Sequence, residues 1–255
     1  MNTSKDLFLG WDVGAWNCPK DADSQDAVCA LRMTSLGPEI VGDIFRGNLR
    51  TILVSEKGPG LIAAILGKVG ADAATDAHVT IAIDSPLAWP KAMVSLLGGD
   101  AVPDVPSEFE KNPYLFRAQE RALFFKRRGP LSPVKDMIGS QSTKAIHFLI
   151  RSGVEERTPG IWSSDSVTAI EAYPSPSKKV KDVSASAERL LERYLKANMS
   201  RGTTWKNDSR DAIVCALVAL LHREDPEQLI APDRTAEPAE GWIWLPKKTA
   251  KIPGR

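Results

Sequence analysis

The sequence predicts a single α/β domain, residues 1–255, in which a mixed sheet of five strands is flanked by helices. Two observations predict this class. Short apolar runs rich in β-branched residues alternate along the chain with longer segments of helical character. With 255 residues, of which 43% are hydrophobic and 25% charged, the chain has the size and composition of an ordinary globular domain with a packed core.

The first three strands are expected to form an antiparallel meander. They are predicted at residues 7–12, 26–33 and 39–45, separated by short polar or Gly- and Pro-containing stretches. A helix is predicted within 58–70. The β-branched run 79–83 then predicts a fourth, buried strand, which the following proline terminates.

A long segment, residues 86–164, is expected as an insert between the fourth and fifth strands. It is rich in Pro, Gly and basic residues and partly helical, with FRAQERALFFKRR as its best helix. Beyond it the sequence predicts a strand at 167–170, a helix at 183–197 and the strongly apolar helix NDSRDAIVCALVALLHRE. The tail holds GWIWLP, a short strand or docking segment, and the basic residues 247–255.

Carboxylates stand at the ends of predicted strands and at the start of the last helix. Strands end at Asp12, Asp84 and Glu171, and Asp208 and Asp211 lie three residues apart on one helical face. Each residue alone has an ordinary explanation, as a turn residue or a helix cap. Their coincidence favours a site, because ligands gather at the carboxyl ends of strands in α/β sheets.

Converging carboxylates repel one another unless a cation joins them. Mg²⁺ and Mn²⁺ prefer oxygen ligands, and two such ions about 4 Å apart can clamp the attacking and leaving oxygens of a phosphodiester. We therefore predict Asp12, Asp84 and Asp211 as ligands of Mg²⁺ or Mn²⁺, with Glu171 or Asp208 completing the ligand shell or positioning water. The sequence contains no nucleophile elbow, no P-loop and no histidine pair at metal-ligand spacing.

The segment from Lys111 to Arg151 carries an excess of positive charge. Its net charge is +7, because nine residues are basic and two are acidic, whereas the whole chain has a net charge of +1. This asymmetry favours a surface for a polyanion, and the alternative is a solvated helical face. Within the segment, Arg117 and Arg121 are expected to hold a phosphate, with Glu120 orienting one of them. An ordinary surface pattern of residues four apart is the alternative.

The order of these elements resembles known proteins. The two strand-ending aspartates and the Asp-rich start of the last helix together resemble the ribonuclease H-like fold, and DSRD is similar to the paired acids of Holliday-junction resolvases. More narrowly, six motifs resemble, in order over residues 7–246, the domain-of-unknown-function family 429, described as predicted ribonuclease H-like nucleases. These motifs are GWDVGAW, AIDSPLAWP, FRAQER, AIEAYPS, DSRDAIVCALVAL and EGWIWLP. Trp11 is a departure from that pattern, since smaller residues are more usual before the aspartate.

The residues and the resemblance together predict a divalent-metal-dependent nuclease that hydrolyses phosphodiester bonds in DNA or RNA. One alternative is a non-catalytic nucleic-acid- or partner-binding module with the same fold. Another is an actin-like phosphotransferase or ATPase, although a second Asp-x-Gly-type loop is missing from the sequence. Three cysteines without a pairing pattern favour a reduced, cytoplasmic protein, and no apolar run is long enough to span a membrane.

Overall fold

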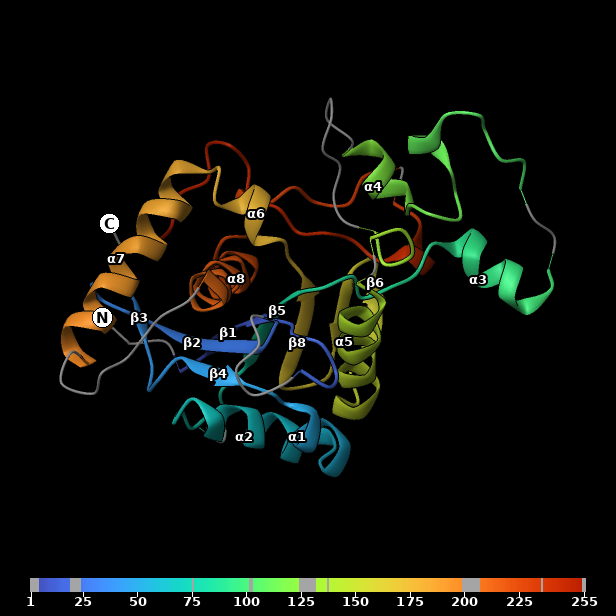
Figure 1. The fold of residues 1–255 in the computed structure, drawn as a ribbon. Helices are drawn as coiled ribbons and strands as arrows, with labels where there is room; N and C mark the ends of the chain where they lie inside the picture. Colours follow the sequence, from blue (N-terminus) through green and yellow to red (C-terminus); the bar gives the residue numbers. More distant parts are fainter. Residues whose placement is uncertain are drawn as a thin grey trace.

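The computed structural model has an eight-stranded mixed sheet with helices on both faces (Figure 1). The structure describes residues 5–18, 24–74, 76–100, 103–123, 132–136, 138–198, 207–234 and 236–253. The strands are β1 (Leu7–Asp12), β2 (Asp26–Thr34), β3 (Gly37–Ile40), β4 (Phe45–Gly47), β5 (Val79–Asp84), β6 (Glu155–Thr158), β7 (Ile161–Ser163) and β8 (Val167–Glu171). The helices are α1 (Arg50–Ser55), α2 (Gly58–Lys68), α3 (Lys91–Gly98), α4 (Ala118–Ala122), α5 (Gly139–Ser152), α6 (Pro174–Ser177), α7 (Lys181–Asn198) and α8 (Asn207–Glu224), with short 3₁₀ turns at Phe109–Lys111, Pro226–Gln228 and Pro238–Glu240.

The sheet has a parallel centre and antiparallel flanks. Its strand order is β3-β2-β1-β5-β8-β7-β6, and β4 pairs with β2 beside this path. The central strands β1, β5 and β8 run parallel, whereas β2 lies antiparallel to β1, and β7 lies antiparallel to β8. The predicted α/β class and mixed sheet are therefore confirmed.

The predicted number of five strands is wrong. The expected third strand at 39–45 is divided into β3 and β4, with Gly42 between them at φ 69°. The hairpin β6–β7 was also missed, because EERT and IWS are short and lack a strand-length apolar alternation. All of these except β7 are edge elements, which depend on pairing with a neighbour more than on burial of their own side chains.

The expected insert, residues 86–164, lies between β5 and β8 in the chain. Its C-terminal part contributes α5 to one face of the sheet, as well as the strands β6 and β7. Figure 1 shows α3 and α4 lying away from the sheet. The tail up to residue 253 is docked, because Ile252 is buried and its N–H donates to Asp182.

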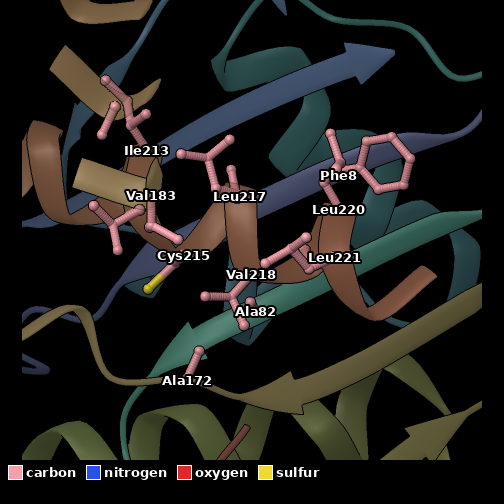
Figure 2. Packing of buried hydrophobic residues seen from close by; sticks show 14 of the residues in the cluster. Phe8, Ala82, Ala172, Val183, Ile213, Cys215, Leu217, Val218, Leu220 and Leu221 are labelled. Atoms are coloured by element: carbon pink, nitrogen blue, oxygen red, sulfur yellow. The ribbon is translucent and has the colours of Figure 1, made fainter. Parts of the chain in front are cut away.

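Two apolar layers cover the sheet. On one face, α7 and α8 form a core with alternate residues of the strands, such as Phe8 and Ala82 (Figure 2). On the other face, α1, α2 and α5 pack on the intervening residues, such as Leu9 and Ile83. Within the described part of the chain, not one helix combines the length and hydropathy that crossing a bilayer requires.

Helix α8 lies against the sheet with its backbone in contact with β1. Every residue from Ala212 to Leu221 is buried, which explains why the helix is apolar on all sides. A Cβ atom at Gly10 would overlap the Ala212 carbonyl oxygen and the Ala216 nitrogen. The absence of a side chain at Gly10 therefore sets how closely the helix approaches the strand.

We expect Gly10→Ala to lower the free energy of unfolding by at least about 2–3 kcal/mol, because two backbone segments would have to move apart. Gly67→Ala on α2 is the matched control, since a Cβ there meets no atom within 4 Å. That variant should be neutral or stabilise by up to about 1 kcal/mol. Urea denaturation measures both, and equal stabilities would contradict the close contact at Gly10.

Candidate active site

Two of the predicted carboxylates lie side by side at the end of the central strands. Asp12 and Asp84 are the last residues of β1 and β5, and they are paired in the parallel register. Adjacent strands lie about 4.8 Å apart, and paired residues of parallel strands point to the same face. By alternation from Phe8 and Ala82, this face is the one covered by α8.

Helix α8 adds two more acids on the same face of the sheet. Asp208 and Asp211 lie in its first turns, just before Ala212, which touches β1 at Gly10. Asp211 accepts from Lys178 Nζ at 2.6 Å, and Asp208 accepts from Arg46 Nε at 2.7 Å. The structure therefore brings four of the five predicted carboxylates together. Two cations, Lys178 and Arg46, form ion pairs with the two aspartates on the helix.

The electrostatics of the four acids are those of a crowded carboxylate cluster. Burial and then the charge of Asp211 raise the pKa of Asp84 to about 8, although Lys178 opposes this rise. Burial, followed by the charges of Asp84, Asp211 and Asp208, raises the pKa of Asp12 well above its usual range. Asp12 and Asp84 each keep part of their surface exposed. A cation that reached them would therefore relieve both desolvation and repulsion.

Glu171, the fifth predicted carboxylate, points to the opposite face of the sheet. It is paired with Ile83 rather than with Asp84, and it alternates with Ile170, which lies on the α8 side. Its side chain is fully buried and receives the Leu87 N–H at 2.9 Å. Arg117 completes its contacts with a two-pronged ion pair of 2.5 and 2.7 Å. Glu171 is therefore a buried structural residue, and it anchors the loop that follows Asp84.

Arg117 and Glu120 are likewise interior residues, although the sequence predicted a phosphate-holding surface. Their exposures are 1% and 0%. Arg117 Nε and Nη2 donate to Glu120 Oε1 at 2.9 and 2.8 Å, so Glu120 orients Arg117 as expected, but toward Glu171. Arg121 is partly exposed, and its Nη1 donates to the Phe116 carbonyl oxygen at 2.5 Å. Helix periodicity could not reveal this burial, because it depends on partners 54 residues and more away.

Four of the quoted motifs meet around Arg117. Arg117 Nη1 donates to the Glu240 carbonyl oxygen at 3.2 Å, and Gln119 Nε2 donates to the Ile243 carbonyl oxygen at 2.9 Å. Ile243 also forms a parallel bridge with Glu171 at the end of β8. The segment GWIWLP is therefore a docking segment, and it fastens α4 to the end of β8.

A second buried ion pair supports the loop after Asp12, and sequence reasoning missed it. Lys144 Nζ on α5 donates to Asp26 Oδ2 at 2.6 Å, and both side chains are fully buried. Asp26 also accepts from Gly14 N at 2.9 Å and from the Trp11 indole at 3.0 Å. Trp11 thus fills core, with 2% of its surface exposed. The sequence shows only that Lys144 stands one turn before the apolar Phe148, and this spacing does not by itself reveal that Lys144 is buried.

Among the described residues of the basic segment, several charges are used in contacts within the protein. Arg117 and Lys144 are buried in ion pairs, and Arg151 donates to the carbonyl oxygens of Glu56 and Val54. Lys126, Arg127 and Arg128 lie outside the described residues. Lys111 and Lys135 are exposed, and each forms an ion pair with a nearby carboxylate.

The acid cluster has the oxygen donors that a divalent ion requires, but its side chains are not arranged as a metal site. All four side chains offer oxygen ligands, and the buried Ser85 Oγ, next to Asp84, has no hydrogen-bond partner among the described residues. However, no three or more His, Cys, Asp or Glu side chains in the described ranges are grouped so that they could hold a metal ion as they stand. Instead, Lys178 forms an ion pair with Asp211, and Arg46 forms one with Asp208. Neither cation had a sequence signal, because each reaches its aspartate from a distant part of the chain.

Stability without metal should fall as the pH rises from 6.5 to 8. Because the pKa of Asp84 rises from 3.8 to about 8 on folding, the folded protein binds a proton that the unfolded chain has already released. The effect is at most about 1.4 kcal/mol per pH unit. Below this window His222, whose pKa burial lowers to about 4, acts in the opposite direction. Thermal melts of the wild type and Asp84→Asn would test this, and identical pH slopes would count against it.

Arg117→Met should lower the free energy of unfolding by about 3–5 kcal/mol, because it leaves Glu120 and Glu171 buried without a cation. Arg121→Met removes the same charge from the same short helix and should cost about 1 kcal/mol or less. Chemical denaturation measures both. A stable Arg117→Met variant that had lost only nucleic-acid binding would restore the surface role predicted from the sequence.

No protein-family model matches the chain, and neither the curated proteins nor the solved structures contain a significant match.

Proposed function

We propose that the chain is a divalent-metal-dependent nuclease with a ribonuclease H-like fold, which hydrolyses phosphodiester bonds in nucleic acid. The observation that carries the proposal is the register of Asp12 and Asp84 at the ends of adjacent parallel strands, with Asp211 presented by α8 on the same face. The succession of antiparallel β1, β2 and β3, parallel β5 and β8 and a final packed helix supports the fold.

In this proposal, Asp12, Asp84 and Asp211 hold Mg²⁺ or Mn²⁺. A bound ion would stabilise charge on the phosphate and supply a more acidic water molecule. Asp208, fixed by Arg46 at the start of α8, orients the attacking water. Glu171 is not a metal ligand in this proposal. It supports the site, because its carboxylate accepts from the Leu87 N–H of the loop that begins at Asp84.

Nucleic acid remains the proposed partner on the strength of the net charge of residues 111–151, although several of those charges are used inside the protein. A cytoplasmic location is proposed from the three free cysteines, two of which are buried.

A non-catalytic binding module is the second candidate, and one observation favours it. Lys178 and Arg46 already pair with two of the four acids, so the cluster is partly neutralised without any bound ion. A protein that never bound metal would need such cations to tolerate its acids. The two candidates differ in whether Mn²⁺ binds and whether cleavage follows.

Asp211→Asn should abolish Mn²⁺-dependent cleavage of a mixed panel of DNA and RNA substrates. The loss should exceed about 100-fold, beyond the 10–100-fold typical of a group that only supports a ligand. Asp208→Asn should keep partial activity. Mn²⁺ should also raise the melting temperature of the wild type but not that of Asp84→Asn, because an ion that binds only the folded state stabilises it. An active Asp211→Asn variant would refute the ligand assignment, and an inactive wild type across the panel would favour the binding module.

A further inference from the structure

Lys178 is a fixed part of the acid cluster. It follows α6, and its backbone N–H donates to the Pro174 carbonyl oxygen at 2.8 Å. At the other end, Nζ lies 2.6 Å from Asp211 Oδ1, with side-chain exposures of 27% for the lysine and 22% for the aspartate. The backbone of Lys178 is therefore anchored at the end of α6, and its ammonium group is paired with Asp211.

Two cations pair with acids of the cluster. Lys178 Nζ contacts Asp211 Oδ1 directly. The other cation at the cluster, Arg46, pairs with Asp208. Lys178 is therefore the cation that pairs with Asp211, which is one of the three proposed metal ligands.

We infer, on the basis of the proposed metal site, that Lys178 is a built-in counter-ion which a divalent ion must displace from Asp211. An ammonium group offers only donors, so it cannot share a ligand shell with a metal ion. A single charge about 5 Å from a divalent ion weakens its binding about tenfold even at the dielectric constant of water. Lys178 thus sets the metal affinity of the site and keeps its acids compatible with folding when the ion is absent.

The test is a Mn²⁺ titration in which electron paramagnetic resonance measures the free ion. Lys178→Met should bind Mn²⁺ about tenfold more tightly than the wild type, and Lys178→Gln provides a second uncharged variant if the first does not fold. Lys178→Arg keeps the charge and should bind no more tightly than the wild type. The matched control is Arg210→Met, which removes one charge beside Asp211 in sequence; Arg210 instead pairs with Glu188 on α7, so the affinity should not change.

Melting temperatures provide a second measurement. Without metal, Lys178→Met should melt a few degrees below the wild type, because the repulsion among the acids is no longer relieved. Its rise on saturation with Mn²⁺ should be larger than that of the wild type. A merely structural lysine would lower both melting temperatures equally.

Each outcome bears on a different claim. Equal or weaker Mn²⁺ binding by both uncharged variants would overturn the role of Lys178 while leaving the metal site in place. Wild-type protein that binds no Mn²⁺, like Asp84→Asn, would overturn the inference and the metal site together. Mn²⁺ binding that depends on Asp84 but brings no cleavage would refute only the nuclease proposal, and the affinity ratio would still decide the role of Lys178.

Discussion

The contact between α8 and β1 at Gly10 is the constraint on which the candidate site depends. A helix buried on all sides has no polar face to orient it, so its rotation is set by the atoms it touches. At Gly10 those atoms are backbone atoms of Ala212 and Ala216. A rotation by one residue, about 100°, would turn Asp211 away from Asp12. The placement of the helical acids is therefore fixed by the contact of the helix with the strand.

The alternation of side chains along the strands places acids that look alike in the sequence on opposite faces of the sheet. Asp84 and Glu171 both end an apolar strand, yet one faces α8 and the other faces the opposite layer. On the α8 side the carboxylates are crowded and two have raised pKa values. On the other side Arg117 pairs with both Glu120 and Glu171 and thereby ties α4 to the end of β8. One face thus carries charge available for a ligand, and the other uses charge to hold the structure.

Much of this arrangement could be predicted from the sequence, within clear physical limits. The residues at the ends of β1 and β5 were predictable because each apolar run stops at a carboxylate, and helix α8 because its apolar run is long. The strands β4 and β6 were not, since three or four residues at an edge carry no periodic signal. Lys178, Arg46 and Lys144 could not be assigned, because the burial and pairing of a basic residue depend on contacts made only in the folded chain.

The cluster around Arg117 also has a consequence for the order in which the chain matures on the ribosome. Arg117 precedes its partner Glu171 by 54 residues in the chain, and Gln119 precedes its partner Ile243 by 124 residues. A growing chain that has emerged past Arg117 but not yet to Glu171 therefore leaves both the Arg117 guanidinium group and the Leu87 N–H without this acceptor. The loop beyond Asp84 gains its anchor only late in synthesis, so the nascent chain carries its acids long before it can hold them in position.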